Sequence, residues 1–336
     1  MINLKLEFLS RKCRAYKVSK RRQLLTGLSV VFIFFIFISY YLAVHWDEFY
    51  SLWRLSYQET ILAGIFLFLG LLLNCYQINL FLQKFNVRLG LLELIFVTHG
   101  MMLGNLVIPM RGGSGGFAVY LKKAHRLNYH KFGVIYGGTA ILVGLVSSVM
   151  GLGALCFIAI KFRIFEPSLT SILTALLLGC VYLTLFTPRL KKNGGGRTLN
   201  FLIRMNESWV GLTKDVTLLI KVTCALILIT LLQTLSLYFI YLAIGRPLSF
   251  SATLITSCLG AVAYLVPITP GSLGVFDAVI IEAPRLLGLD TTAAIMGAVW
   301  LRILSFVICL ALGLPGLFYF FKGIRSTESD PGIEKG

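Results

Sequence analysis

The sequence predicts an all-α integral membrane protein, and its composition, its apolar stretches and its charge distribution carry that prediction. Of the 336 residues, 57% are hydrophobic and only 13% are charged, and the mean hydropathy is +0.84. Soluble domains have about 25% charged residues, and a soluble chain this apolar would expose apolar patches on every face. The net charge of +17 is expected to lie at the cytoplasmic face, beside anionic lipid headgroups, and not to bind nucleic acid.

Six apolar stretches are long enough to span the membrane, because a helix needs about 20 apolar residues to cross it. The basic tail 1–23 precedes the first stretch. This stretch is expected to be an uncleaved span, since a signal peptide has a shorter apolar core and a small-residue cleavage site. The expected spans are residues 24–44, 60–82, 132–160, 168–187, 222–244 and 291–321.

The charged loops orient these spans in the cytoplasmic (inner) membrane. Basic residues collect on the cytoplasmic side, so the tails 1–23 and 322–336 and the loop 188–221 are expected there. With those orientations, segments 91–130 and 250–289 must each enter the membrane and return to the same face. Each is predicted to be a re-entrant hairpin or a short pair of spans, giving about eight membrane segments or more in a polytopic helical bundle.

The two returning segments resemble each other in sequence. Pro109-Met-Arg-Gly-Gly-Ser-Gly-Gly-Phe aligns with Pro267-Ile-Thr-Pro-Gly-Ser-Leu-Gly-Val, and a proline, two glycines and a serine coincide. The first copy enters from inside and the second from outside. The chain is therefore predicted to contain two membrane repeats, 24–160 and 161–321, related by inverted topology, as in many transporters.

Both motifs contain residues that interrupt a helix, and four of them are expected to be structural breaks at membrane depth: Pro109, Pro267, Pro270 and Gly274. Backbone groups freed there must face protein or water. A short helix after each break would direct its N-terminus into the middle of the protein, and two such termini would form an anion site. The alternative is that the glycines only allow helices to pack closely.

Several charges lie inside apolar segments, where they are costly and usually face a cavity or a partner. In one interpretation Arg111 and Arg302 hold a phosphate-bearing headgroup, with Asp277 as a counter-charge. In the other, Arg302 and Asp277 form a structural pair, and both interpretations stay open. The candidate headgroup-binding residues are His99, Asn105, Arg111, Gly112, Gly113, Ser114, Thr269, Gly271, Ser272, Asp277 and Arg302.

The chain contains no recognisable catalytic or metal-binding motif. Its seven cysteines are scattered singly, and its four histidines make no ligand spacing with them or with each other. We therefore expect no catalytic residue, no metal and no cofactor.

The hairpin motifs resemble the two signatures of the lysylphosphatidylglycerol synthase transmembrane-region family, which is also described as flippase-like. These motifs are Asn105-Leu-Val-Ile-Pro-Met-Arg-Gly-Gly-Ser and Pro267-Ile-Thr-Pro-Gly-Ser-Leu-Gly-Val-Phe-Asp277, and Arg302 matches an arginine of the family's last long helix. The resemblance covers about residues 20–322. The sequence departs from it at Ser114 and Phe117, where many members carry an acid and an arginine.

The resemblance implies a lipid flippase or translocator that moves a phospholipid or a polyprenyl-linked lipid. Aminoacyl-lipid synthases of this type carry a soluble transferase domain, and the chain ends soon after its last apolar helix, so the enzyme half is not expected. The alternatives are a membrane-embedded lipid or glycolipid transferase and an accessory subunit of a lipid or glycan synthase. Expected partners are membrane lipids, anionic or phosphate-bearing. A homo-oligomer and association with lipid- or glycan-synthesis enzymes are left open.

Overall fold

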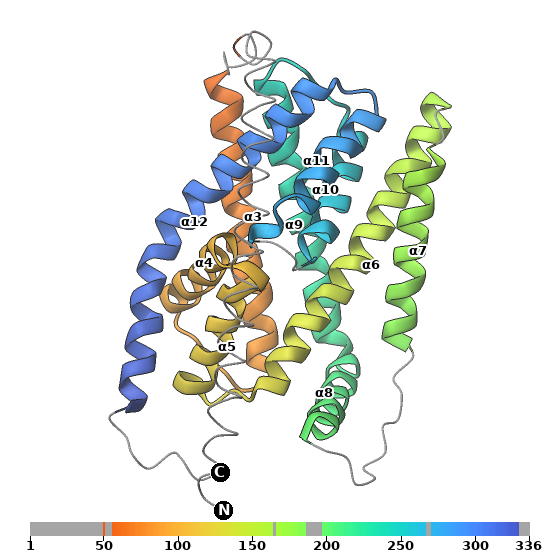
Figure 1. The fold of residues 1–336 in the computed structure, drawn as a ribbon. Coiled ribbons are helices and arrows are strands. Elements are labelled where there is room, and N and C mark those ends of the chain that lie inside the picture. Colours follow the sequence, from red (N-terminus) through yellow and green to blue (C-terminus); the bar gives the residue numbers. More distant parts are fainter. Residues whose placement is uncertain (1–49, 51–55, 164–165, 186–196, 267–269, 329–336) are drawn as a thin grey trace, which may run out of the picture.

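Five helices in the described part of the chain are long and apolar enough to cross a membrane, and they form the frame of the protein. They are α3 (Tyr57–Lys84), α6 (Tyr129–Phe162), α7 (Pro167–Leu185), α9 (Val216–Ala243) and α12 (Thr291–Glu328). The structure is a computed structural model that describes residues 50, 56–163, 166–185, 197–266 and 270–328 (Figure 1). The expected first span, 24–44, and the tail 1–23 lie outside these residues.

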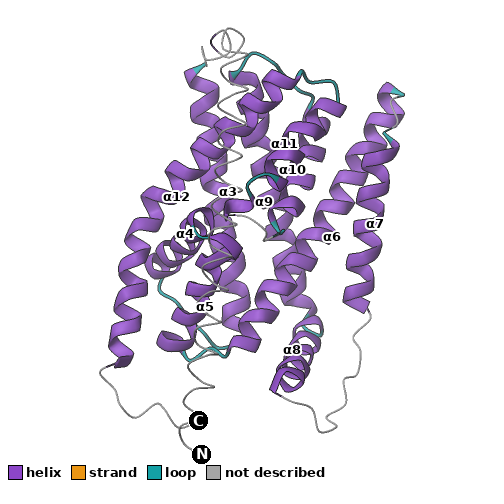
Figure 2. Cartoon of the chain, viewed as in Figure 1, coloured by secondary structure: helices purple, strands orange, loops and turns teal. Residues whose placement is uncertain are grey.

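The described residues contain helices and no strand (Figure 2). Large apolar side chains such as Ile61, Ile160 and Leu185 are exposed on the outside of these helices. Exposed apolar surface on long uncharged helices is what a lipid-facing bundle requires. The protein is therefore a polytopic helical membrane protein, as the composition predicts.

Helices α3 and α9 pack side by side and define the two ends of the bundle. At one end Lys84 Nζ lies 2.6 Å from Asp215 Oδ2. At the other end the backbone N–H of Ser56 donates to the carbonyl of Ala243 over 3.2 Å. The C-terminus of α3 and the N-terminus of α9 therefore share one end, which is the lower end in Figure 1.

Two helical hairpins enter the bundle from opposite ends (Figure 1). The first comprises α4 (Leu91–Val107), the 3-10 helix η1 (Pro109–Arg111) and α5 (Gly112–His125), and it begins at the lower end. The second comprises α10 (Phe250–Tyr264), η2 (Pro270–Ser272) and α11 (Val275–Leu286), and it begins at the upper end. The longest arm, α4, has 17 residues, about 26 Å, which is less than the roughly 30 Å of a hydrocarbon core.

The stretch 188–221, expected as a loop, contains a helix, α8 (Arg197–Thr213). Its apolar residues pack on α6: a Cβ added at Gly138 would lie 2.7 Å from the Trp209 ring, and one at Gly133 would lie 3.1 Å from Met205 Sδ. Ile203 and Leu212 are buried on the same helix. The connection between α7 and α9 is therefore partly helical, and the sequence did not predict this helix because α8 is amphipathic, with too many polar residues to resemble a span.

Candidate functional site

The tips of the two hairpins contact each other inside the bundle. The guanidinium of Arg111, in η1, donates through Nη2 to the carbonyl oxygen of Tyr264, at the end of α10. A Cβ added at Gly271, in η2, would lie 3.0 Å from Leu106 Cδ2 of the first hairpin. The irregular backbone of each tip therefore packs on protein, as would be required of irregular backbone inside a membrane.

The first tip has an unusual backbone that sets the position of Arg111. Met110 and Arg111 are consecutive non-glycine residues with φ of 54° each. Such left-handed residues cost on the order of 1–3 kcal/mol each and persist where the surrounding structure imposes them. Here Arg111 is the N-cap of α5, so this backbone fixes its side chain at the contact between the two hairpins.

The glycines of the first tip serve packing. A Cβ added at Gly113 would lie 2.0 Å from the carbonyl oxygen of Met101, and one at Gly112 would lie 2.2 Å from Ile108 Cγ2. Helices α4 and α5 can therefore meet this closely only where the side chain is a hydrogen atom. This geometry corresponds to the packing alternative at these two positions.

Asn105 and Ser114 tie the arms of the first hairpin together. Asn105 Oδ1 accepts a hydrogen bond from the backbone N–H of Ser114 over 2.9 Å. Asn105 Nδ2 donates to Ser114 Oγ over 3.0 Å. Both side chains are buried. Because a helix start leaves its first N–H groups unpaired, Asn105 satisfies one of these groups at the start of α5.

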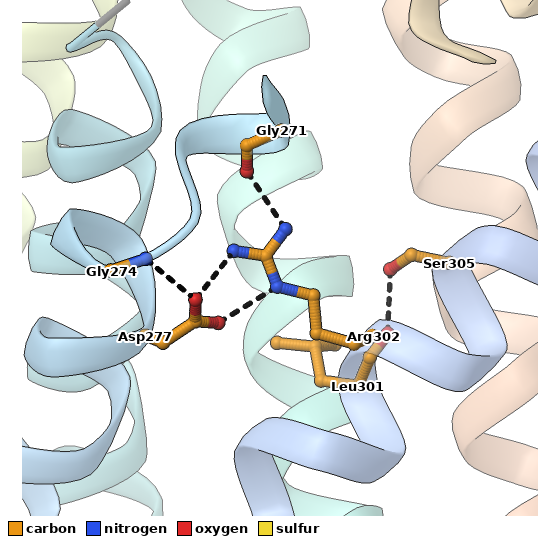
Figure 3. A network of polar contacts seen from close by, with 6 residues as sticks. All are labelled: Gly271, Gly274, Asp277, Leu301, Arg302 and Ser305. Carbon is orange, nitrogen blue, oxygen red and sulfur yellow. Dashed lines mark hydrogen bonds and ion pairs between the residues drawn. The ribbon is translucent and has the colours of Figure 1, made fainter. Parts of the chain in front are cut away.

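Arg302 is held by the second hairpin (Figure 3). Its Nε and Nη2 donate to the two carboxylate oxygens of Asp277 over 2.8 and 3.0 Å, and its Nη1 donates to the Gly271 carbonyl over 2.8 Å. Asp277 also accepts from the backbone N–H of Gly274 at the start of α11. This carboxylate occupies the helix N-terminus where an anion would otherwise bind. The arrangement corresponds to the structural pair considered above.

Arg111 has no such partner. Its guanidinium donates to the hydroxyl of Tyr136 and to the Tyr264 carbonyl. Its Cζ also lies 5.3 Å from the ring centroids of both tyrosines. In the described part of the chain no carboxylate pairs with it. Of Arg111 and Arg302, only Arg302 therefore has a carboxylate partner among the described residues.

Arg111 lines a cavity of about 280 Å³ between the helices. Most of the lining is apolar and comes from four of the frame helices, α3, α6, α9 and α12, and from the arms of both hairpins. The polar lining residues are Asn74, Gln77, Asn105, Arg111, Tyr136, Thr139, Thr230, Gln233, Ser257, Tyr264, Arg302 and Ser305. A cavity with an apolar wall and few polar groups is typical of a site for an amphipathic ligand.

The remaining candidates lie elsewhere. His99 is fully buried and is not part of the cavity lining; its Nδ1 donates to the Ile95 carbonyl over 2.7 Å. Ser272 donates to the carbonyls of Tyr264 and Val266 inside its own hairpin. Thr269 lies outside the described residues, as does Pro267.

Sequence reasoning did not assign Tyr136, Gln77, Thr139 or Ser257 to the site. A lone polar residue in an apolar span is more often a helix contact than part of a site, so the sequence offered no signal that would select these four. Among the residues that the structure describes, no three His, Cys, Asp or Glu side chains gather as a metal site would require.

The protein is thus a polytopic helical bundle in which two opposed hairpins meet beside a central cavity. The family model of the lysylphosphatidylglycerol synthase TM region matches residues 24–313. The chain therefore belongs to this family, which confirms the resemblance found in the hairpin motifs. No curated protein sequence matches the chain significantly.

Proposed function

We propose that the protein is a lipid translocator that binds the phosphate-bearing head of a membrane lipid in the central cavity. Membership of the family supports a role in lipid handling. The observation that carries the proposal is Arg111, a cation that lines a mostly apolar cavity and has no carboxylate partner among the described residues.

The energetics favour an anion beside this side chain. An arginine at the centre of a membrane costs roughly 2.5–3.5 kcal/mol on insertion scales. The two tyrosine rings offset part of this cost by cation–π attraction. Only two hydrogen bonds from the guanidinium are accounted for, while a guanidinium carries five N–H donors. A phosphate would accept the remaining donors in charge-assisted hydrogen bonds.

The packing of the helices supports an inverted repeat. Under that repeat α3 corresponds to α9, α4 to α10, α5 to α11 and α6 to α12. The contact of α4 with α12 then has its counterpart in the contact of α10 with α6, and α3 packs on α9, its own equivalent. Two such halves that rock around a shared site provide alternating access. The headgroup would cross between the hairpins while the acyl chains stay in lipid.

The orientation we propose places the lower end of Figure 1, with α8 and the Lys84–Asp215 pair, in the cytoplasm. Basic residues support it, because Lys122, Lys123 and Arg126 lie at the same end, where α5 finishes. The positive-inside rule assigns such clusters to the cytoplasmic side.

A transport assay in vesicles tests the proposal. Wild-type protein, Arg111→Gln and Arg111→Lys are reconstituted with fluorescent phospholipids, and crossing is followed by quenching from outside. We expect Arg111→Gln to lower the rate about tenfold or more, since hydrogen bonds to charged groups are strong. Lysine keeps the charge but loses the planar fork, so Arg111→Lys should be intermediate.

The matched control is Arg285→Gln, which removes an arginine that is half-exposed and paired with Glu282 away from the cavity. It should transport at the wild-type rate. Melting temperatures in detergent show whether each variant is folded. Transport by folded Arg111→Gln at the wild-type rate would overturn the proposal.

A further inference from the structure

A stripe of exposed apolar side chains runs along one face of α12. Its members follow one another at a spacing of three or four residues, which places them on the same side of a helix. They are Ile303, Phe306, Val307, Leu310 and Leu314, and each is between 37% and 56% exposed. No described helix covers this face of α12, so it is free to receive lipid or a further helix.

Helix α6, the counterpart of α12 in the inverted repeat, has a partner on the equivalent face. Aligning the first residues of the two helices, Tyr129 and Thr291, pairs Gly144 with Phe306. Gly144 is buried, and a Cβ added there would lie 2.5 Å from Cys180 Sγ of α7. Helix α7 therefore covers on α6 the position that is exposed on α12, and in Figure 1 α7 and α12 lie on opposite outer sides of the bundle.

A second pair of positions supports this alignment independently. It pairs Gly151 with Gly313, and both glycines receive the first arm of a hairpin. A Cβ added at Gly151 would lie 3.5 Å from Cys258 Cβ of α10, and one at Gly313 would lie 2.8 Å from the His99 carbonyl oxygen of α4. Because α4 and α10 are themselves counterparts, the two glycines occupy the same place in each repeat.

The counterpart of α7 is the apolar segment 24–44, which lies outside the described residues. It precedes α3 as α7 precedes α9, and α3 and α9 have 28 residues each. The segment contains no charged residue, so it can cross the membrane beside another helix. It leads to the start of α3 at the upper end of the bundle, and a span that ends there would run antiparallel to α12, as α7 runs antiparallel to α6 (Figure 1).

We propose that residues 24–44 form a helix that packs along the exposed stripe of α12, as α7 packs along α6. Each repeat then contributes its first helix to cover the last helix of the other repeat. The inference rests on the inverted repeat of the proposed function, and it depends neither on Arg111 nor on what the cavity binds.

Cysteine cross-linking in native membranes tests this contact. Phe306→Cys is combined, in a full-length chain without other cysteines, with one cysteine at a time at positions 27–38. A protease site is inserted at 194–196, so that after oxidation and cleavage only a disulfide keeps the two fragments together on a gel without reductant. Since a helix has 3.6 residues per turn, we expect links at about three to five of these positions, spaced three or four residues apart.

A second reporter tests the direction of the segment. Leu310→Cys lies about one turn below Phe306 on the same stripe. For an antiparallel pair, its linked positions should move by about four residues towards residue 24. Leu310→Cys also keeps the contact testable if Phe306→Cys does not reach the membrane.

Leu228→Cys, on α9, is the matched control. Leu228 is 48% exposed and Phe306 is 45% exposed, and both residues follow the inserted protease site. Leu228→Cys should form no link with any of positions 27–38.

Three results would overturn the proposal. Links to Leu228→Cys but to neither α12 cysteine would place the segment on another face. Links that give a band of twice the mass before cleavage would assign the stripe to a second copy of the protein. No link at any position would leave the stripe to lipid. None of these results changes the expected transport by Arg111→Gln, so failure of this inference is distinguishable from failure of the proposed function.

Discussion

Arg302 and Asp277 lie 25 residues apart in the sequence and form a two-pronged ion pair that fastens α12 to the second hairpin. Three donors of the guanidinium are used within this hairpin, one of them by the Gly271 carbonyl. The pair is partly shielded, with side-chain exposures of 21% for Arg302 and 7% for Asp277. Its consequence is that the arginine matching the family pattern holds the fold of the tip, while Arg111 has no carboxylate partner in the described part of the chain.

Arg302→Leu is expected to destabilise the protein strongly, because it leaves the Asp277 carboxylate buried and unpaired. Breaking a buried pair in this way costs about 3–5 kcal/mol, whereas replacing both partners by apolar residues is often neutral. The double variant Arg302→Leu with Asp277→Leu should therefore recover most of the melting temperature in detergent. A double variant that melts no higher than Arg302→Leu would contradict the structural role of the pair.

Gly113→Ala is expected to separate the arms of the first hairpin. The added methyl group would meet the Met101 carbonyl oxygen at 2.0 Å, and backbone cannot move as a side-chain end does. Overpacking of this kind costs about 1–3 kcal/mol or more. Gly115→Ala is the matched control, since a Cβ there meets nothing within 4 Å. Thermal unfolding in detergent compares them, and equal melting temperatures would argue against close packing of α4 on α5.

The pairing of Lys84 with Asp215 predicts a pH dependence at one end of the bundle. The hydrogen bond from Lys84 holds the pKa of the Asp215 carboxyl below its usual value. A lowered pKa stabilises the folded state above the unfolded pKa of about 4, and the stabilisation is lost as the pH falls through the folded pKa.

Asp215→Asn should therefore flatten the loss of thermal stability below about pH 4. The amide can still accept the capping hydrogen bond that Asp215 Oδ1 receives from Leu218 N–H. Lys84→Met should flatten the same part of the profile, because it removes the donor. If the melting temperatures of wild type and variants fall in parallel below about pH 4, the Lys84–Asp215 pair does not contribute to the acid loss of stability.

The proposed orientation predicts that position 200, in α8, faces the cytoplasm. Asn200→Cys, introduced into a chain without other cysteines, should react with an impermeant thiol reagent only after the membrane is opened. A cysteine replacing Ser249, the N-cap of α10 at the opposite end, should react in intact cells. Labelling in the reverse order would invert the topology and the direction in which each hairpin enters.

The five described spans were predictable because an uncharged stretch of about 20 residues has few alternatives to a membrane helix. The two returning hairpins were predictable as well, since the basic residues left no other way to connect the loops. Helix α8 was not, because its apolar residues are interspersed with polar ones and pack on Gly133 and Gly138 of α6. The mean hydropathy of an amphipathic surface helix is too low to distinguish it from a polar loop.

The sequence by itself determined the membrane class, the family and the residues that could carry charge into the membrane. Only the tertiary structure decided which arginine is paired, because Arg302 and Asp277 meet through the packing of α12 on the second hairpin. It also excluded His99 from the cavity and brought Gln77, Thr139 and Tyr136 into the lining that contains Arg111. Hydropathy and motifs can be read from residues that are neighbours along the chain. Whether a buried charge is paired depends on side chains that folding brings together from distant segments.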